Sequence, residues 1–163
     1  MDSDLPRSFK LVTVWLLIGL ALFLGVKRWQ HRAQQMRFSA GTEVVEIRRG
    51  PDGHYHWPGV IEGRAVDFLV DTGATGTAVP ARLARELRLQ PIDSVQTDTA
   101  GGVVTGQVMC ADIELRGGVR AERLRVLALD GLSDRPLLGM DVLGRLRWQQ
   151  VDGVLRIEAG RPR

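Results

Sequence analysis

The chain has few of the residues that build disulfide scaffolds, thiolate metal clusters and histidine-dependent active sites. Its 163 residues include one cysteine, Cys110, and three histidines. A single cysteine excludes a disulfide within the chain and a cluster of metal-binding thiolates. All three histidines precede residue 57 and no motif-bearing serine accompanies them, so a Ser-His-Asp set is not indicated. The glycine pairs at 101–102 and 117–118 lack the strand-loop-helix context of a phosphate-binding loop.

Two of the histidines, His54 and His56, alternate along one predicted strand and would share a face. Two imidazoles without a third ligand nearby make a poor metal site, so we interpret this segment as a solvated strand. Cys110 lies in an apolar, strand-like run, and we expect a buried and unreactive thiol. The sequence therefore predicts neither a metal nor a cofactor.

The net charge of +3 is unevenly distributed along the chain. Residues 1–40 carry six basic side chains against two acidic ones, whereas residues 41–163 carry 16 arginines against 17 acidic residues. A nearly neutral domain lacks the electrostatic footprint of a nucleic-acid-binding protein. The basic N-terminal part instead suits a segment that lies beside anionic lipid.

Residues 11–26 form a run of sixteen residues without a charge, flanked by Lys10 and by Lys27-Arg28. The run is slightly shorter than the roughly 20 residues that cross a hydrocarbon core about 30 Å thick. A cleaved signal peptide is the alternative interpretation, but no small-residue cleavage site follows the run. We therefore predict an uncleaved single-pass anchor in contact with membrane lipid, preceded by an N-terminal tail at residues 1–10.

Two features of the sequence favour opposite orientations of this anchor in the membrane. More basic residues follow the run than precede it, which favours a cytoplasmic location for the rest of the chain. A short charged tail before an apolar run, however, is typical of an export signal-anchor. We expect a single-pass protein of the cell (inner) membrane with its folded domain on the extracytoplasmic, periplasmic side, although the flanking charges favour the other side.

Beyond a polar, basic linker at 27–42, strand and turn signals alternate. One helix is predicted, with Pro80 in its first turn, Leu83 and Leu87 on one face, and Arg82 four residues before Glu86. The pattern predicts a mainly β domain, a small closed barrel with one or two short helices, over residues 43–158 and a C-terminal tail at 159–163. Strands are expected at 43–47, 54–61 (interrupted by Pro58-Gly59), 65–70, 107–115 and 124–129, with a closing hairpin at 146–151 and 154–157.

The most informative segment is an apolar strand that gives way to Asp71-Thr72-Gly73-Ala74. A carboxylate at a buried strand end is costly unless it is hydrogen-bonded or shares its charge. The threonine hydroxyl and the glycine N–H supply such partners, as a general base that holds a water between two carboxylates requires. The alternative is a strand-ending aspartate that caps a turn.

The surroundings of Asp71 favour a catalytic role. The run Phe68-Leu69-Val70-Asp71-Thr72-Gly73-Ala74, followed about 65 residues later by Leu137-Leu138-Gly139, resembles the retropepsin family of aspartic proteases. In particular, the chain is similar to the membrane-tethered, retroviral-type aspartic proteases of bacteria. The resemblance extends from about residue 43 to residue 157, and it implies a retropepsin-like barrel that hydrolyses peptide bonds of protein substrates.

The resemblance also implies a role for each residue of the two motifs. Asp71 would be the catalytic aspartate, Thr72 would brace its partner across a dimer, and Gly73, followed by Ala74, would offer backbone contacts near the water. Leu138 and Gly139 would pack behind the site. The tip of a β-hairpin flap would lie at 99–103, around Ala100, Gly101 and Gly102; glycines suit a mobile lid, and an ordinary hairpin loop is the alternative.

An aspartic protease needs two carboxylates about 3 Å apart that share one proton. The chain has one D-T-G, and Asp130, Asp134 and Asp141 lack a following Thr/Ser-Gly. The second aspartate must then come from a second chain, so we predict an obligate homodimer with a two-fold axis between the Asp71 residues.

Two positions depart from the family pattern. Retroviral enzymes usually carry an acidic residue soon after D-T-G-A, paired with an arginine directly after the later glycine. Thr75 and Met140 occupy these places, so neither half of the pair is left as an unpaired buried charge. The dimer strength and the substrate specificity of the retroviral enzymes are therefore not expected to apply to this chain. A non-catalytic, membrane-tethered dimeric binding or scaffold module of the same fold is the alternative function.

Overall fold

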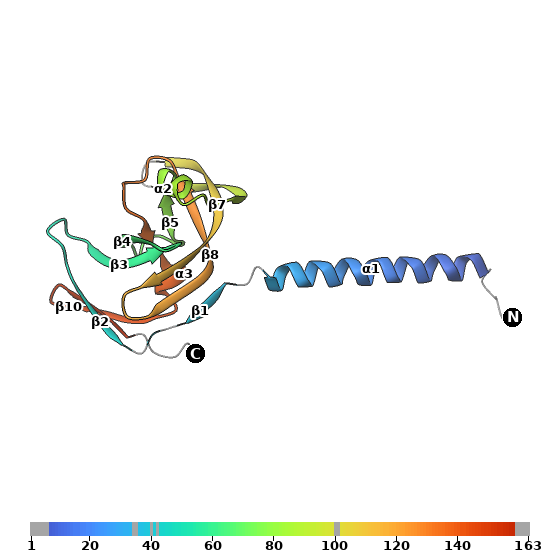
Figure 1. Ribbon diagram of the computed structural model, residues 1–163, viewed down its shortest axis with the longest axis horizontal. Helices are drawn as coiled ribbons and strands as arrows, with labels where there is room; N and C mark the ends of the chain where they lie inside the picture. Colours follow the sequence, from blue (N-terminus) through green and yellow to red (C-terminus); the bar gives the residue numbers. More distant parts are fainter. Residues whose placement is uncertain (1–6, 34–35, 40, 42, 100–101, 159–163) are drawn as a thin grey trace. The chain divides into compact units, whose positions relative to one another are not determined.

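The structure is a computed structural model that describes residues 7–33, 36–39, 41, 43–99 and 102–158. The chain forms two compact units, residues 1–35 and residues 36–163 (Figure 1). Among the described residues, the first unit contains one helix, and the second contains both sheets and the hydrophobic core. The core unit thus begins before the predicted boundary at residue 43, because residues 37–39 form a strand that pairs within it.

Helix α1 (Arg7–Ala33) extends beyond the predicted anchor at both ends. Its described side chains, residues 14–27, are all exposed, and most of them are apolar. Within the described part of the chain, no helix combines the length and the apolar character needed to cross a bilayer. The anchor over residues 11–26 stays a prediction. Residues 27–33, assigned from sequence to a linker, continue the helix.

The second unit is mainly β. Strand β1 pairs with β8, and short helices follow β5 and β9. The elements after α1 are β1 (Arg37–Ser39), β2 (Val44–Arg48), β3 (Tyr55–Ile61), β4 (Arg64–Val70), β5 (Ala78–Pro80), α2 (Ala81–Glu86), β6 (Pro91–Thr99), β7 (Gly102–Leu115), β8 (Val119–Leu129), β9 (Leu137–Leu138), α3 (Met140–Leu143), β10 (Arg147–Val151) and β11 (Val154–Glu158).

The larger sheet has the order β1-β8-β5-β9-β4-β3-β7-β6, and β7 also pairs with β8. That extra pairing joins two strands that are separated along the sheet, so β8, β5, β9, β4, β3 and β7 form a closed ring. A second sheet has the order β10-β11-β2, with all its strands antiparallel. The predicted mainly β architecture with few short helices is confirmed.

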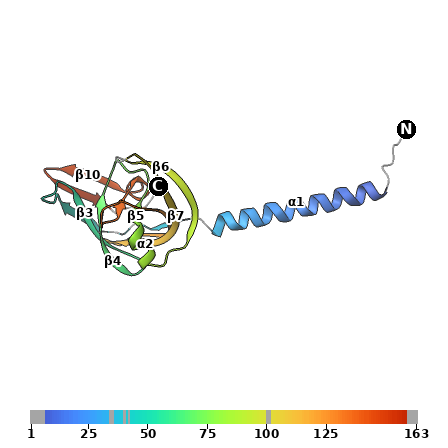
Figure 2. The same ribbon diagram turned by 90° about the horizontal axis from the view of Figure 1, so that it is seen from above.

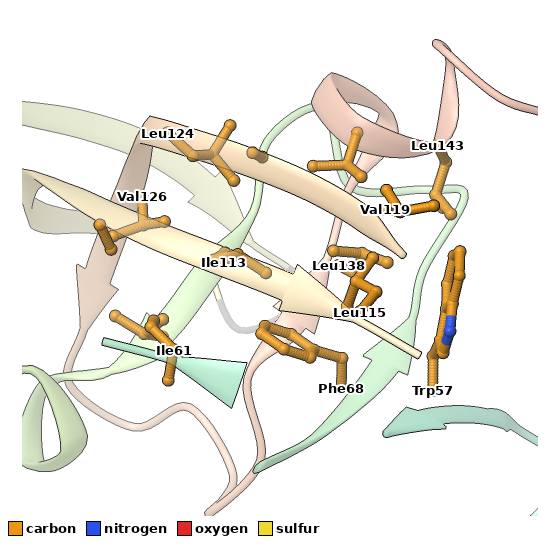
Figure 3. Close-up of a cluster of buried hydrophobic side chains, with 14 of the residues drawn as sticks. Trp57, Ile61, Phe68, Ile113, Leu115, Val119, Leu124, Val126, Leu138 and Leu143 are labelled. Atoms are coloured by element: carbon orange, nitrogen blue, oxygen red, sulfur yellow. The ribbon is translucent and has the colours of Figure 1, made fainter. Parts of the chain in front are cut away.

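The hydrophobic core combines buried side chains of this ring with buried side chains of β2, β11, α2 and α3, and Figure 3 shows part of it. Trp57 and Phe68, which are opposite each other on β3 and β4, are fully buried together with Leu138. Burying each such side chain contributes about 1.5–3 kcal/mol. The indole N–H of Trp57 donates to the carbonyl oxygen of Arg116 at 2.9 Å, so its polar atom is satisfied inside the core.

Strand β3 runs without a break through Pro58-Gly59, where the sequence predicted an interruption. Proline lacks only the N–H, and the Pro58 carbonyl accepts a hydrogen bond from the Arg116 N–H at 3.0 Å. A Cβ at Gly59 would lie 2.6 Å from the Glu114 carbonyl oxygen, so glycine allows β7 to approach β3 closely. The predicted interruption of the strand was wrong, because Pro58 and Gly59 both fit the antiparallel pairing of β3 with β7.

Helix α2 confirms the expected helix, with Pro80 as its N-cap and an Arg82–Glu86 hydrogen bond of 3.0 Å. Residues 91–99, which were not among the strands expected from the sequence, form β6, and β7 begins at Gly102, before the start expected at residue 107. Cys110 on β7 is a free thiol and is half-buried, whereas a buried one was expected.

Candidate active site

Asp71 follows directly after β4, where β4 runs parallel to β9. The register pairs Leu69 with Leu137 and Val70 with Leu138. The N–H of Asp71 continues this ladder, because it donates to the Leu138 carbonyl oxygen at 3.0 Å. Parallel pairing therefore places the D-T-G segment beside the Leu-Leu-Gly segment. The Asp71 side chain is half-buried at this junction.

The loop after Asp71 orients its carboxylate. The Gly73 N–H donates to Asp71 Oδ1 at 2.8 Å, and the Ala74 N–H donates to the Asp71 carbonyl oxygen at 3.3 Å. A Cβ on Gly73 would come within 3.2 Å of Oδ1, which is a tight contact. Glycine at this position therefore favours the close approach of the N–H to the carboxylate. Thr72 is exposed on the same loop.

Leu138 and Gly139 lie directly behind the loop. Leu138 is fully buried, and a Cβ on Gly139 would lie 2.4 Å from the carbonyl carbon of Gly76 and 2.5 Å from its oxygen. A side chain larger than hydrogen would push the loop away from β9. The N–H groups of Met140 and Asp141 donate to the carbonyl oxygens of Ala74 and Thr75 at 2.9 and 3.1 Å. Backbone hydrogen bonds thus join the loop to α3 at Thr75 and Met140.

Sequence reasoning missed one side-chain pair that fixes this loop, Thr77 and Asp141. Thr77 is 1% exposed; its N–H donates to Asp141 Oδ2 at 2.9 Å and its hydroxyl donates to Oδ1 at 2.8 Å. The same hydroxyl accepts the Gly139 N–H at 3.3 Å. The Thr77 carbonyl oxygen accepts the Leu127 N–H of β8 at 3.0 Å. The signal was a carboxylate two residues after Leu-Leu-Gly, which was set aside because no Thr/Ser-Gly follows it.

The predicted flap region forms a β-hairpin. Strands β6 and β7 are antiparallel from Pro91↔Met109 to Thr99↔Gly102, with a register shift between Pro91 and Asp93. Gly102 has a φ of +107°, a backbone conformation that favours glycine. Ala100 and Gly101 lie outside the described residues. That this hairpin closes over a substrate stays a prediction.

The strand histidines form no metal site within the described residues, where no group of three potential ligands occurs. His56 Nε2 instead lies 2.8 Å from Asp52 Oδ2, and an Arg135 guanidinium nitrogen lies 3.1 Å from His56 Nδ1. The His54 backbone N–H, and then the His56 ring, lower the pKa of Asp52 below its ordinary value of 3.8. These side chains form a polar network at the start of β3.

Two sequence comparisons match this chain to known proteins. A profile of the family described as gag-polyprotein putative aspartyl protease matches residues 57–145, which is more than half of the chain and includes both motifs. An uncharacterized protein in the cobV 5′ region of Sinorhizobium sp. is 27% identical over 164 residues, covering 89% of this chain and 70% of that protein.

Two solved structures are similar to this chain to different degrees. A retropepsin-like aspartic protease from Rickettsia conorii superposes with a TM-score of 0.58 at 20% identity, covering 76% of this chain and 91% of that chain. The simian foamy virus (mac) protease gives a TM-score of 0.43 at 24% identity, covering 55% of this chain and 91% of that one. The Rickettsia likeness shows that the fold is the retropepsin-like one.

Proposed function

Because this chain belongs to the gag-polyprotein putative aspartyl protease family, that is, to the retropepsin-like aspartic proteases, we propose that it is an endopeptidase that hydrolyses peptide bonds of protein substrates. The observation that carries the proposal is the placement of Asp71. Its carboxylate lies at the end of β4, is oriented by the Gly73 N–H, and is backed by Leu138 and Gly139.

The proposed reaction uses two Asp71 carboxylates that share one proton. The ionised carboxylate takes a proton from a water held between them, and the water oxygen forms a bond to the carbonyl carbon of the peptide. The protonated carboxyl gives its proton to the carbonyl oxygen, producing a tetrahedral diol. When the carbon–nitrogen bond breaks, the nitrogen receives a proton from the dyad and leaves as an amine. One hydroxyl of the diol becomes the carbonyl of the product acid and returns its proton to the dyad, which restores the starting state.

A homodimer supplies the second carboxylate. Among the other acidic residues weighed from the sequence, Asp141 accepts hydrogen bonds from Thr77 at both of its oxygens. The Asp130 side chain is 90% exposed and lies 3.9 Å from Arg85. Asp134 lies on the segment between β8 and β9 and contributes to a small surface hollow beside Arg64 and Glu86. Among the described contacts, none joins any of these three carboxylates to Asp71, which supports an active site shared by two chains.

We further propose that residues 11–26 anchor the chain in the cell (inner) membrane, with the protease domain on the extracytoplasmic side. The support is the uncharged run together with the exposure of apolar side chains along α1, of which Trp15 is 68% exposed. Contact with lipid would remove this apolar surface from water. Reporter fusions at the C-terminus, active only on one side of the membrane, test the orientation; a reporter active only in the cytoplasm would contradict it.

The activity is tested with the full chain in detergent micelles and a mixture of unstructured peptides as substrate. Asp71→Asn keeps the shape of the side chain but removes the base, so activity should fall on the order of 10²-fold or more. Asp130→Asn, which changes an exposed aspartate, is the matched control and should keep full activity. A pH–rate profile of the wild type should be bell-shaped. Equal turnover by wild type and Asp71→Asn would instead favour a non-catalytic binding module.

A further inference from the structure

A cluster of charged and titratable side chains near the start of β3 is not used by the hydrolysis proposed above. It contains one imidazole, two carboxylates and one guanidinium, which belong to His56, Asp52, Asp67 and Arg135. The His56 side chain is 18% exposed, whereas the other three side chains are about half exposed. The ring of His56 is therefore the least exposed member of this group, which we name the His56 cluster.

The contacts of the His56 ring differ in which charge state they favour. A guanidinium nitrogen of Arg135 lies 3.1 Å from Nδ1 and 3.4 Å from Nε2. Arginine can only donate hydrogen bonds and is always charged, so this contact suits a neutral ring. On the other side, Asp52 Oδ2 lies 2.8 Å from Nε2 and Asp67 Oδ2 lies 3.6 Å from Nδ1. A protonated ring donates from both nitrogens, so it would attract both carboxylates and repel the guanidinium.

The ring has no other charged partner among the described residues. Arg49, on the preceding turn, donates from Nε to the Gly53 carbonyl oxygen. His54, on the same strand, is exposed. The His54 backbone N–H and the His56 ring lower the pKa of Asp52, so this carboxylate stays ionised where a histidine titrates. The cluster thus carries one net negative charge while His56 is neutral and no net charge once His56 is protonated.

The His56 cluster lies on the face of the sheet that carries the proposed catalytic carboxylate. His56 is opposite Leu69 in the β3–β4 register, and opposite side chains share a face. Strands β3 and β4 lie side by side in both views of the ribbon (Figures 1 and 2). Asp71 follows two residues after Leu69 and continues the ladder of β4, so it belongs to the same face, about 7 Å farther along the strand.

Arg135 is tied to the same place by the backbone. It directly precedes Pro136, whose carbonyl oxygen accepts the Leu69 N–H at 2.8 Å. An extended peptide advances about 3.3 Å per residue. A peptide whose scissile bond lies at Asp71 would therefore bring a side chain about two residues from that bond to the His56 cluster.

We propose that Arg135 determines a specificity for acidic substrate side chains, and that protonation of His56 makes Arg135 available for them. The inference rests on the proposed function, because it concerns a peptide bound at Asp71. While His56 is neutral, its ring and Asp52 retain the guanidinium. When His56 is protonated, the two carboxylates retain the ring, and Arg135 is released to pair with a carboxylate of the peptide. The preference for acidic side chains is thus present below the pH range in which the ring titrates and is lost above it.

Peptide binding by the full-length Asp71→Asn chain in detergent micelles tests this proposal. Asp71→Asn cannot hydrolyse the peptide by the proposed mechanism, and it also removes the other carboxylate whose titration would affect binding. Two pools of unstructured fluorescent peptides are compared, identical except for glutamate or glutamine at one position. At about pH 5.5 the glutamate pool should bind about threefold more tightly, and at about pH 7.5 the two pools should bind equally. The peptide glutamate is ionised at both pH values, so its own charge does not change.

Single substitutions in the same background assign the effect to its residues. Arg135→Gln should bind both pools equally at both pH values. His56→Gln cannot be protonated, so its ratio of the two dissociation constants should not change with pH. His54→Gln is the matched control, at an exposed histidine of the same strand, and should keep the pH dependence of the parent.

Nuclear magnetic resonance of the His56 ring gives a measurement that needs no peptide. In Arg135→Gln the midpoint of the ring titration should move to higher pH, by about half a unit or more, because a neighbouring positive charge is removed. A midpoint that does not move, a parent that binds both pools equally at the lower pH, or an Arg135→Gln chain that keeps the preference would overturn the proposal.

The failure of this inference can be told apart from the failure of the proposed function, because neither measurement depends on turnover. A chain that shows the pH-dependent preference, while the parent with Asp71 intact hydrolyses no peptide, would retain the His56 switch and lose the protease. A chain that hydrolyses peptides but binds both pools equally at both pH values would retain the protease and lose the switch. A chain that binds neither pool at either pH would lose both.

Discussion

The buried pair of Thr77 and Asp141 makes a quantitative prediction about how the active-site loop is held. Replacing Thr77 by valine keeps the shape of the side chain and removes only the hydroxyl. Two hydrogen bonds disappear: the one donated to Asp141 Oδ1 at 2.8 Å and the one accepted from the Gly139 N–H at 3.3 Å. The backbone N–H of Thr77 still donates to Asp141 Oδ2, so the carboxylate keeps a partner.

The expected cost follows from these two contacts. A hydrogen bond to a charged group contributes about 1.5–3 kcal/mol and a neutral one about 0.5–1.5 kcal/mol. Because Thr77 is fully buried, water cannot replace the lost partners, and the free energy of unfolding should fall by roughly 2–4 kcal/mol. Peptidase activity should fall as well, because Gly139 and Leu138 position the backbone of Asp71.

Urea unfolding of the full chain in detergent, followed by tryptophan fluorescence, measures the change in the free energy of unfolding. Thr105→Val, at an exposed threonine of β7, is the matched control and should stay within about 0.5 kcal/mol of the wild type. The slope of the transition should be the same for all three proteins. A loss below about 1 kcal/mol for Thr77→Val, or an equal loss for both variants, would refute the view that this pair fixes the loop.

Three further predictions concern the loop, the core and the surface. Gly139→Ala should lose about 1–3 kcal/mol of unfolding free energy and most activity, because its Cβ would collide with the Gly76 backbone. Gly76→Ala, whose Cβ would make only an ordinary contact of 3.9 Å with Asp141 Oδ2, should be tolerated in the same urea titration. Phe68→Ala should cost about 3–5 kcal/mol, measured in the same way, because the ring is fully buried. Arg64 chiefly lowers the pKa of Glu86 below its ordinary value of 4.5, so this contact stabilises the fold above that pH. The stability difference between wild type and Glu86→Gln should therefore disappear as the pH falls below 4.5; a difference that grows on acidification would contradict this sign.

Local patterns were sufficient to predict most elements near the site. Alternating and apolar runs around 65–70 predicted β4, and the spacing of Leu83 and Leu87 with the Arg82–Glu86 pair predicted α2. The residues that form these patterns lie within one helical turn or one strand of each other, so the patterns can be recognised in the sequence itself.

Features that depend on long-range pairing were missed. Strand β6 begins with Pro91 and alternates poorly, and it is held by its register with β7. The Thr77–Asp141 contact joins residues 64 positions apart, and it exists only because β4 and β9 run side by side in parallel. Neither residue type is unusual on its own, and only the three-dimensional arrangement shows that both oxygens of Asp141 are occupied.

Thr75 and Met140, which depart from the retroviral pattern, are accommodated by the loop and by α3. Where the retroviral pattern would have an ion pair, the Met140 N–H donates to the Ala74 carbonyl oxygen and the Asp141 N–H donates to the Thr75 carbonyl oxygen, so backbone hydrogen bonds join the loop to α3. The Thr77–Asp141 pair lies just beyond them and supplies a charged contact that is fully hydrogen-bonded. The loop that carries Asp71 is therefore fixed without the ion pair.

The central claim, that one active site takes one Asp71 from each of two chains, is tested most directly by mixing. Wild-type and Asp71→Asn chains are allowed to exchange subunits at a fixed total concentration, and peptidase activity is measured against the fraction of wild-type chain. If both aspartates are needed, activity follows the square of that fraction, so an equal mixture retains about a quarter of the full activity. A linear dependence, with half of the activity retained, would show that each chain carries a complete site by itself.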